Sequence, residues 1–444
     1  MNFGDFCIIF GEMERILIVG SGYVGLTAAV CFASFGNRVV LFDKNREKID
    51  QLSSGRVPFY EQGLSDFYAR VRENIFLTCE LKDHVSECRF VFIAVGTSLR
   101  NETTDLTDYM EAVVGVSKLL NRGKILVIKS TVPVDALQWT RKELGRNSKE
   151  EFSLVVNPEF LREGNALYDF NHPDRIVIGV EDDFAKDKML ELYRPIDAPK
   201  VITSPETACM IKYVSNAFLA TKISFINEIA DICGLYGIDV KEVEYAVGLD
   251  RRIGRDYLSA GIGFGGSCLL KDVVSLIEMS EDKGYHPDLI KATREVNFKR
   301  VTLFVEKIRH SLGDGDRKLG VWGISFKPNT GDIRGSRSIE IMKRLLALGY
   351  SLKAYDPKAN DNARRLFGDS VRVVDDPLSA VVDASALLVL TDWPQFKDID
   401  LIKVKSLMKK PYLFDGRNLF DPREVMEKGF KYFGVGRGID HQQG

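Results

Sequence analysis

The sequence has little that would mark a metal, nucleic-acid or membrane protein. Its 444 residues include only five histidines, and these form no HxH or HExxH pair, which argues against a zinc site. With a formal net charge of −2, the chain has no basic excess for nucleic acid or an anionic membrane. No apolar run reaches the length that spans a bilayer. We therefore expect no metal, no nucleic-acid partner and no membrane segment.

Cysteine is also sparse and unpatterned. The seven cysteines are scattered and include no CxxC, so we expect no disulfide framework and a reducing, cytoplasmic location. Residues 1–11 lack the basic start and the cleavage pattern of a signal peptide. Because Met13 directly precedes the first strand pattern, residues 1–12 are either an extension of the fold or the product of an upstream start codon.

The length exceeds what one hydrophobic core organises, so two or three domains are expected. Strand and helix patterns alternate at both ends of the chain, and one long helical pattern lies between them. The fold class predicted is α/β, with two doubly wound Rossmann-like domains joined by a long central helix and a small helical domain. The boundaries predicted are 1–203 for a dinucleotide-binding domain, 204–312 for a helical dimerisation domain and 313–444 for a second α/β domain.

The first third of the chain contains a dinucleotide-binding pattern. An apolar strand at 15–19 leads into Gly20-Ser-Gly-Tyr-Val-Gly25, a helix at 26–35 and a second strand at 38–42 that ends at Asp43. The glycines allow a tight turn and close approach of a pyrophosphate, and the carboxylate suits a ribose 2′-hydroxyl. An acid at this position favours NAD over NADP. The cofactor-binding residues predicted here are Gly20, Gly22, Tyr23, Val24, Gly25 and Asp43.

Further strands, at 89–95, 124–129 and 153–156, each end in polar residues. Ligands bind at the carboxyl ends of parallel strands, so Thr97, Thr131 and Glu159 are candidates. Ser130 is better explained as a helix N-cap. A strand at 176–180 is expected to complete the sheet.

A long helix is predicted from Thr207 to about Tyr236, started by Ser204-Pro-Glu206. Its surface is apolar nearly all round, which predicts burial between domains and against a second subunit. Lys212 and Asn216 are four residues apart and so share one face. They are either a catalytic pair, or a lysine that reaches solvent and a solvated asparagine.

Cys268 ends the glycine-rich run Gly261-Ile-Gly-Phe-Gly-Gly-Ser-Cys268, directly before a helix at 269–279. Unpaired N–H groups and the positive end of the helix dipole favour the thiolate there, as a nucleophile requires. The alternative is a buried structural cysteine.

The last third repeats the α/β pattern without a full GxGxxG, with polar residues after its strands. Lys327, Arg334 and Arg417 at such positions predict a phosphorylated ligand. Arg337 and Arg365 are instead interpreted as partners in surface salt bridges.

Taken in order, these motifs resemble the UDP-glucose/GDP-mannose dehydrogenase family over nearly the whole chain. The motifs are Gly20-Ser-Gly-Tyr-Val-Gly25, Ser130-Thr-Val-Pro133, Asn157-Pro-Glu-Phe-Leu-Arg-Glu-Gly164, Lys212-Tyr-Val-Ser-Asn216, Phe264-Gly-Gly-Ser-Cys268, Phe326-Lys-Pro-Asn-Thr330 and Asp415-Gly-Arg-Asn418. The resemblance implies a four-electron, NAD-dependent oxidation of a sugar-nucleotide alcohol to an acid. UDP-glucose is the sugar nucleotide favoured, and GDP-mannose and UDP-N-acetylhexosamines are the alternatives.

The resemblance also implies roles for single residues. Cys268 would form a thiohemiacetal and then a thioester, while Lys212 and Asn216 would hold the oxyanion. The other catalytic residues implied are Asp272, Thr131, Glu159 and Glu163. The substrate-binding residues implied are Phe160, Leu161, Lys212, Arg252, Phe264, Gly265, Phe326, Lys327 and Arg417. Arg334 would contact the phosphates of NAD, and Thr97 and Thr131 are also predicted to bind the cofactor. Arg252 would act from the partner subunit of a homodimer.

Some positions depart from the family pattern, and two other functions compete. The departures are Ser98, Asp135, Cys209, Leu269 and Leu270, none of which removes a catalytic group. A β-hydroxyacid dehydrogenase would perform one two-electron step and would need neither Cys268 nor the last domain. An inactive dinucleotide-binding scaffold is the non-enzymatic alternative. The number of NADH formed per sugar nucleotide, two, one or none, separates the three.

Overall fold

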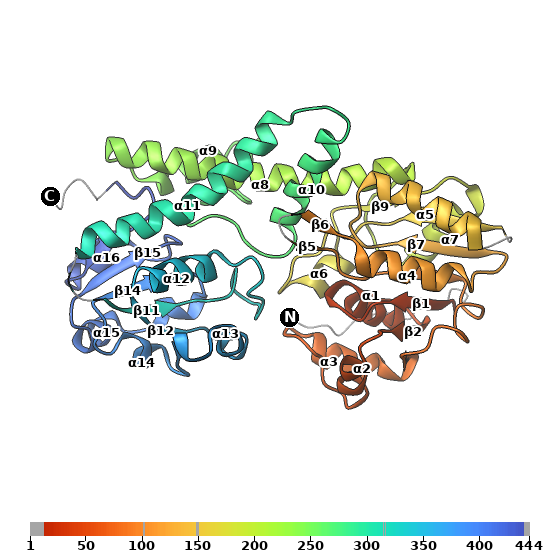
Figure 1. The fold of residues 1–444 in the computed structure, drawn as a ribbon, viewed down its shortest axis with the longest axis horizontal. Coiled ribbons are helices and arrows are strands. Elements are labelled where there is room, and N and C mark those ends of the chain that lie inside the picture. The colour runs from red at the N-terminus through yellow and green to blue at the C-terminus, as the bar shows by residue number, and fades with distance from the viewer. Residues whose placement is uncertain (1–12, 101–102, 148–150, 314, 316, 439–444) are drawn as a thin grey trace. The chain divides into compact units, whose positions relative to one another are not determined.

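The computed structural model describes residues 13–100, 103–147, 151–313, 315 and 317–438. Residues 1–12, whose origin the sequence leaves open, lie outside the described residues. The chain divides into two compact units, an N-terminal unit of residues 1–215 and a C-terminal unit of residues 216–444. Each unit is described by itself below (Figure 1).

The N-terminal unit is built on an eight-stranded sheet in the order β10-β9-β8-β7-β4-β1-β2-β3. Its strands are β1 (Arg15–Val19), β2 (Arg38–Phe42), β3 (Ile75–Thr78), β4 (Phe90–Ile93), β7 (Lys124–Ile128), β8 (Phe152–Val156), β9 (Ile176–Gly179) and β10 (Lys200–Thr203). The strand order reverses direction between β1 and β4, where an open α/β sheet binds its ligand.

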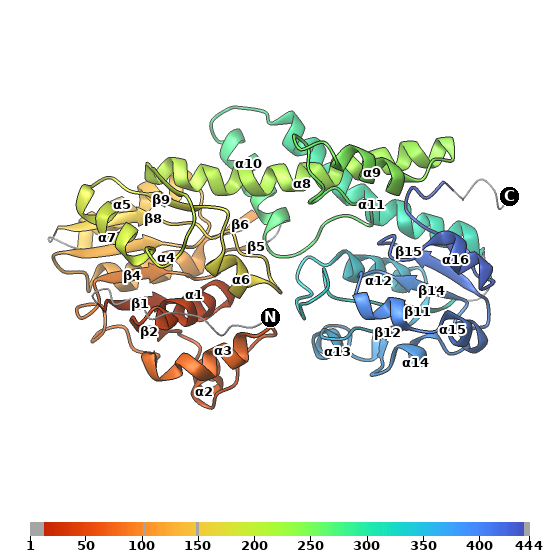
Figure 2. The same cartoon turned by 180° about the vertical axis from the view of Figure 1, so that it is seen from behind.

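Successive apolar side chains of the buried strands point to opposite faces of this sheet, so that both faces are packed. In β1, Ile16 and Ile18 join the core on the side of α1, and Leu17 and Val19 join the core on the side of α4 and α5. The helices of this unit are α1 (Tyr23–Ser34), α2 (Arg46–Ser53), α3 (Leu64–Val71), α4 (Thr107–Ser117), α5 (Val134–Asn147), α6 (Ala166–Asn171) and α7 (Asp183–Leu192). Figures 1 and 2 show these helices on the two faces of the sheet.

The sheet extends further than the sequence predicts at both edges. The edge strands β3 and β10 are additions, and β9 does not complete the sheet because β10 pairs with it. β9 also runs antiparallel to β8, whereas the central strands are parallel. A small antiparallel pair, β5 (Ser98–Arg100) and β6 (Thr103–Asp105), follows β4.

The long helix α8 (Pro205–Tyr236) matches its prediction closely and contains 32 residues. The hydroxyl of Ser204 accepts a hydrogen bond from the N–H of Thr207, as an N-cap should. Part of this helix is exposed in the single chain, and its burial against a second subunit stays a prediction. Phe218, Phe225 and Ile232 are 65%, 53% and 46% exposed and recur every seven residues on one face.

The C-terminal unit contains a six-stranded parallel sheet in the order β13-β12-β11-β14-β15-β16. Its strands are β11 (Lys318–Trp322), β12 (Ser351–Tyr355), β13 (Arg372–Val373), β14 (Ala386–Val389), β15 (Tyr412–Asp415) and β16 (Lys431–Phe433). The order corresponds to that of β3-β2-β1-β4-β7-β8 in the N-terminal unit. The prediction of a second doubly wound domain is thereby confirmed, with β16 as an addition.

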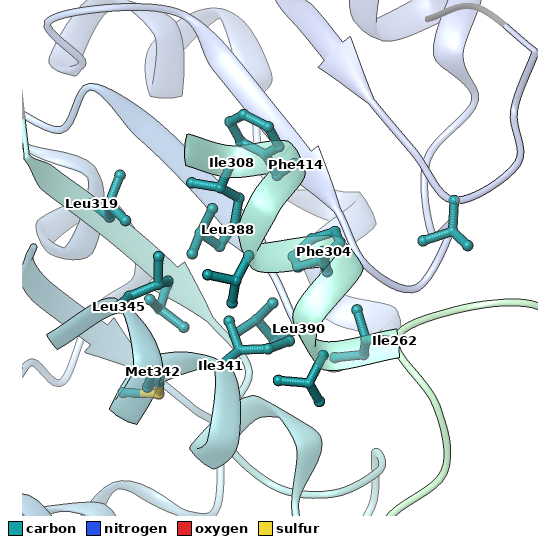
Figure 3. Close-up of a cluster of buried hydrophobic side chains, with 14 of the residues drawn as sticks. Ile262, Phe304, Ile308, Leu319, Ile341, Met342, Leu345, Leu388, Leu390 and Phe414 are labelled. Carbon is teal, nitrogen blue, oxygen red and sulfur yellow. The ribbon is translucent and has the colours of Figure 1, made fainter. Parts of the chain in front are cut away.

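The helices that follow α8 in this unit are α9 (Val240–Gly248), α10 (Leu269–Glu281), α11 (Asp288–Leu312), α12 (Arg337–Ala347), α13 (Asn360–Phe367), α14 (Pro377–Val381), α15 (Leu401–Leu407) and α16 (Pro422–Glu427). α11 and α12 pack on the sheet, whereas α10 packs on α8. In Figure 3, Phe304 and Ile308 of α11 lie near Leu388 of β14 and Phe414 of β15. Ile262 belongs to the same core, so the segment that leads to Cys268 is anchored in it.

Candidate active site

The glycine-rich turn after β1 has the geometry that a dinucleotide requires. A Cβ on Gly25 would lie 1.8 Å from the carbonyl oxygen of Gly20, so α1 packs directly on the turn. A Cβ on Gly20 would lie 2.7 Å from the oxygen of Ala94, and Gly20 has a φ of 107°. At Gly22, by contrast, nothing lies within 4 Å. The turn is therefore closed toward the protein and open at the N-terminus of α1, where a pyrophosphate fits.

Asp43 at the end of β2 is held by this same turn. Its Oδ2 accepts hydrogen bonds from the N–H and hydroxyl of Ser21 at 2.9 and 2.7 Å, and its Oδ1 accepts one from the N–H of Asn45. Burial acts to raise the pKa of this carboxyl, but these hydrogen bonds and the charge of Lys48 outweigh it, and the pKa is lowered. An ionised acid thus stands where a ribose diol would bind.

Tyr23, the first residue of α1, is tied to Glu61, which the sequence did not single out. The Tyr23 hydroxyl donates to Glu61, and the same carboxylate accepts from the N–H groups of Gly164 and Ala166 at 2.6 and 2.8 Å. Burial and the charges of Glu61 and Glu163 raise the pKa of Tyr23, which keeps the phenol neutral. Glu61 therefore connects the start of α1 to the loop that carries Glu159 and Glu163.

The polar residues after β4 and β7 lie at one edge of the sheet. The Thr97 hydroxyl donates to the carbonyl of Thr131 at 3.0 Å, which brings these two predicted residues together. Ser130 donates to the carbonyl of Val95 at 2.7 Å, and α5 begins only at Val134, so the N-cap prediction for Ser130 is wrong.

Lys212 of α8 forms a buried ion pair in the N-terminal unit. Its Nζ lies 3.1 Å from Oε1 of Glu159, and both side chains are less than a tenth exposed. The other oxygen of Glu159 accepts from the N–H of Leu161 at 2.6 Å. The ring of Phe160 lies against Lys212 and, at 3.9 Å, against the guanidinium of Arg175. The alternative of a solvent-reaching lysine is excluded by this burial.

A second lysine, Lys129, is buried in the same unit and was missed in the sequence. It follows β7 directly, and its Nζ donates to Oδ1 of Asn157 at 3.0 Å and toward the Tyr193 hydroxyl at 3.4 Å. Burial lowers its pKa to about 8, against the attraction of Glu159 and with the repulsion of Lys212. A charged residue directly after the wholly apolar strand 125–128 was the available signal.

In the C-terminal unit, Cys268 is the residue at which α10 begins. Its carbonyl accepts the first helical hydrogen bond, from the N–H of Asp272 at 2.9 Å, and its side chain is exposed. The exposure rules out the alternative of a buried structural cysteine. A thiol at this position faces the positive end of the helix dipole, which favours its thiolate form.

The glycines before Cys268 are required by close packing. A Cβ on Gly263 would lie 2.5 Å from Oδ1 of Asn297, one on Gly265 would lie 2.4 Å from the carbonyl oxygen of Gly335, and one on Gly266 would lie 2.7 Å from the Phe326 ring. The cysteine loop therefore packs directly on the segment that carries Phe326 and Lys327.

Asp272 and Asn216 meet in the C-terminal unit. The amide of Asn216 donates to Oδ2 of Asp272, and Nζ of Lys271 donates to its Oδ1 at 2.6 Å. All three side chains are buried. The alternative of a solvated Asn216 is excluded. Lys271 was missed, although its place beside Asp272 in the first turn of α10 was visible in the sequence.

Arg337 is buried, and its prediction as a surface residue is wrong. The side chain is 0% exposed; its Nε donates to the carbonyl of Phe264 at 2.9 Å, and its NH1 donates to Glu340. The amide of Asn297 meanwhile bonds both the N–H and the carbonyl of Phe264. Both the N–H and the carbonyl of Phe264 are thus hydrogen-bonded, and its ring is buried beside α10.

The cationic residues predicted to bind the ligand have different surroundings. Arg417 donates one hydrogen bond to each of the carbonyls of Leu390, Gly263 and Phe326. These bonds use three of the five N–H groups of its guanidinium. Burial lowers its pKa. Arg334 is exposed and paired with Asp332, and Lys327 lies 5.5 Å from the Phe326 ring. Arg252 is paired with Asp250, and its side chain is 88% exposed.

The described residues contain neither a metal-binding cluster nor a helix that could span a membrane. No cluster of histidine, cysteine or acidic side chains in the described part of the chain could hold a metal ion. Among the described helices, none combines the length and the apolar character that crossing a membrane demands.

Three family models match successive segments of the chain. They are described as the NAD binding domain, the central domain and the UDP binding domain of the UDP-glucose/GDP-mannose dehydrogenase family, and they match residues 14–197, 206–299 and 320–422. The chain belongs to this family. It is an NAD-dependent oxidoreductase.

Relatives match along almost the whole chain. UDP-glucose 6-dehydrogenase TuaD of Bacillus subtilis is 42% identical over 431 residues, covering 96% of this chain and 94% of that protein. UDP-glucose 6-dehydrogenase of Rhizobium meliloti is 40% identical and covers 95% and 99%. Among solved structures, a UDP-glucose dehydrogenase of Pyrobaculum islandicum has a TM-score of 0.90 at 37% identity, covering 96% and 98%. A UDP-D-ManNAc dehydrogenase of Pyrococcus horikoshii has a TM-score of 0.84 at 26% identity, covering 96% and 99%.

Proposed function

We propose that this chain oxidises the C6 alcohol of UDP-glucose to a carboxylate, with two NAD⁺ consumed and one water added. The support is the exposed cysteine at the start of α10, in a chain 42% identical to a UDP-glucose 6-dehydrogenase over nearly its full length. The match of residues 320–422 to a UDP binding domain favours UDP over GDP as the nucleotide.

In the first step the alcohol loses a proton and a hydride. Asp272 is the proposed base, either directly or through a water that it orients, and the buried amide of Asn216 and ammonium of Lys271 hold its carboxylate in place. NAD, when bound, accepts the hydride in each of the two oxidations. Gly20 and Gly25 shape its turn, Gly22 leaves room for the pyrophosphate, and Asp43 offers an ionised acceptor to the ribose.

In the second step the Cys268 thiolate adds to the aldehyde carbon, since an aldehyde gives up hydride readily only after something has added to it. The thiohemiacetal oxyanion would be held by Lys212 and Asn216, one helical turn apart on α8. Loss of the second hydride gives a thioester. Water, positioned by Thr131, Glu159 and Glu163, then displaces the thiolate and yields the acid.

We assign the nucleotide part of the substrate to the C-terminal unit. Lys327 and Arg417 are proposed to contact the UDP, and Phe264, Gly265 and Phe326 to pack beside it. Phe160 and Leu161 are proposed to contact the sugar nucleotide, and Arg334 with Thr97 to contact NAD. Arg417 has two N–H groups beyond its three carbonyl bonds, which is the number that a bidentate phosphate contact uses.

A homodimer through α8 is proposed from its exposed apolar face, formed by Phe218, Phe225 and Ile232. Arg252 would then act in the partner's site, which its 88% exposed side chain permits. The predicted segments 1–203, 204–312 and 313–444 would correspond to cofactor, dimer and UDP functions. A cytoplasmic location is proposed because the seven cysteines of the sequence are scattered and include no CxxC.

Comparing sugar nucleotides tests the substrate. The purified chain is given NAD⁺ with UDP-glucose, GDP-mannose or UDP-N-acetylhexosamines, and NADH formation is followed. The highest kcat/KM is expected for UDP-glucose. A higher kcat/KM for GDP-mannose or for a UDP-N-acetylhexosamine would transfer the assignment to that substrate.

A further inference from the structure

Lys129 is a buried lysine to which the proposed reaction gives no role. Its side chain is 4% exposed, and its ammonium donates to three neutral oxygens: the carbonyl and Oδ1 of Asn157, at 3.3 and 3.0 Å, and the hydroxyl of Tyr193, at 3.4 Å. A buried ammonium is costly without a carboxylate beside it. The cost of burying this ammonium suggests that its charge has a function.

The charges that face Lys129 are those of the catalytic cluster. Glu159, on the loop after β8, attracts it, and Lys212, on α8, repels it. Glu159 is already paired with Lys212 at 3.1 Å. One carboxylate thus lies between two ammonium groups, and the three side chains of Glu159, Lys212 and Lys129 together carry one positive charge when Lys129 is protonated.

Two other titratable groups near Lys129 stay neutral. Tyr193, at the end of α7, has its pKa raised by burial and by the nearby Cys31. Cys31, on α1, has its own pKa raised by burial. The charge of the cluster therefore falls by one as Lys129 loses its proton, which its pKa places at about 8.

Lys129 also fixes the loop that carries Glu159. It bonds both oxygens of Asn157, two residues before Glu159, and the amide of Asn157 donates in turn to the carbonyl of Val177 at 2.8 Å. The hydroxyl of Tyr193 donates to Oδ1 of Asn157 at 2.6 Å. A neutral side chain of similar length would retain the packing of this network but not its charge.

We propose that Lys129 is a positioning residue for the step that forms the oxyanion. Glu159 cannot neutralise both Lys129 and Lys212, so Lys212 remains able to bind the oxyanion that forms on the substrate. This inference rests on the proposed function of Lys212. A developing negative charge then completes the cluster instead of competing with Glu159 for Lys212.

The test compares the parent with Lys129→Met between pH 6.5 and 9.5, with kcat/KM for UDP-glucose as the measurement. At pH 6.5 to 7 the parent is expected to be faster by about tenfold, the order of magnitude of one charge–charge interaction inside a protein. The ratio is expected to fall toward one above pH 8, because the parent's own lysine becomes neutral there. A purely structural role would give a ratio that does not change with pH, and that result would overturn the inference.

Two further variants complete the design. Lys129→Arg keeps the positive charge at every pH. Its kcat/KM is therefore expected to exceed that of Lys129→Met over the whole pH range, without the fall that deprotonation of Lys129 causes in the parent. Lys124→Met, at the other end of β7, is the matched control and should follow the parent's profile, since Lys124 donates only to the Ser86 carbonyl.

Failure of the proposed function would look different. If the parent does not oxidise UDP-glucose, or if Lys212→Met keeps full activity, the role of Lys212 is wrong. If the parent is active, Lys212→Met is inactive and the ratio of parent to Lys129→Met is flat with pH, only the inference about Lys129 is wrong.

Discussion

At the scale of single residues, the carboxylate of Asp43 is expected to set the choice of dinucleotide. Its lowered pKa keeps it ionised at neutral pH, where it accepts from a ribose hydroxyl and repels a 2′-phosphate. Asp43→Asn should raise KM for NAD⁺ roughly 10- to 150-fold, which corresponds to the loss of one charge-assisted hydrogen bond. It should also lower the ratio of kcat/KM with NAD⁺ to kcat/KM with NADP⁺. Steady-state kinetics with both dinucleotides measure this. Equal or better kcat/KM of the parent with NADP⁺ would refute it.

Lys129 also makes a prediction about stability. Its pKa is about 8 in the folded protein against an ordinary value of 10.5, so between these values the unfolded chain binds more protons. Folding stability should therefore rise with pH across this window in the parent, by on the order of 3 kcal/mol relative to Lys129→Met. Denaturant titrations of both proteins at pH 7.5 and 10 measure the difference. Parallel changes in the two proteins would contradict a shifted pKa.

Residues that carried a local signal could be identified in the sequence, and residues that act through distant partners could not. Gly20, Asp43 and Cys268 each sit at a strand end or helix start, and the structure places them there. Glu61 gave no such signal, because its partner Gly164 lies 103 residues away. Arg337 was misjudged for the same reason, since the Phe264 carbonyl that it binds is 73 residues distant.

At the scale of elements, two glycines of the turn before α1 are expected to have different roles: Gly25 is needed for folding and Gly22 for cofactor binding. Gly25→Ala would place a methyl group 1.8 Å from the Gly20 oxygen and should destabilise the N-terminal unit by several kcal/mol. Gly22→Ala meets nothing within 4 Å, and Gly22 has a φ of −72°, so stability should be unchanged.

The same Gly22→Ala change should weaken NAD binding at least tenfold, because its methyl group would stand where the pyrophosphate approaches the turn. Thermal melting and NAD titration of the two variants measure both effects. Unaltered NAD affinity in Gly22→Ala would move the cofactor away from this turn. Gly36→Ala is not a suitable control, because Gly36 has a φ of 90°.

The exposed face of α8 makes a second prediction at this scale. Phe218→Glu should turn a dimer into a monomer at micromolar concentration, since the charge would be buried in the interface. Sedimentation velocity measures the change, and Leu366→Glu on α13 is a control at an exposed leucine off α8. A parent that is monomeric and fully active would refute both the dimer and the shared role of Arg252.

Elements were predictable where hydrophobic period and caps agreed. β1 and β2 have their predicted bounds, and α8 differs by two residues at its start. The edge strands β3 and β10 escaped prediction because they are four residues long and partly exposed, which weakens the apolar pattern. The antiparallel direction of β9 could not be read from its sequence, because Ile-Val-Ile-Gly suits either direction.

At the scale of the whole molecule, two units with corresponding strand orders have different chemistry after their second strands. Asp43 after β2 is bonded to Ser21 and Asn45 at an open turn. Asp356 after β12 instead accepts from Ile324, Ser325, Lys358, Ala359 and Trp393 and is 1% exposed. The second carboxylate is thus saturated by its own unit, which agrees with a single dinucleotide site in the N-terminal unit.

The central claim is that one chain carries an alcohol through two oxidations, with Cys268 required only for the second. The alcohol-to-aldehyde step needs a base and a hydride acceptor, whereas the step to the acid needs an adduct at carbon. The most direct measurement is the number of NADH molecules formed per UDP-glucose, with quantification of the acid, in the parent and in Cys268→Ala. The account predicts two NADH and one acid per sugar for the parent, and no sustained production of acid for Cys268→Ala, with NAD and UDP-glucose affinity nearly unchanged. Two NADH per sugar at near the parent rate in Cys268→Ala would contradict it.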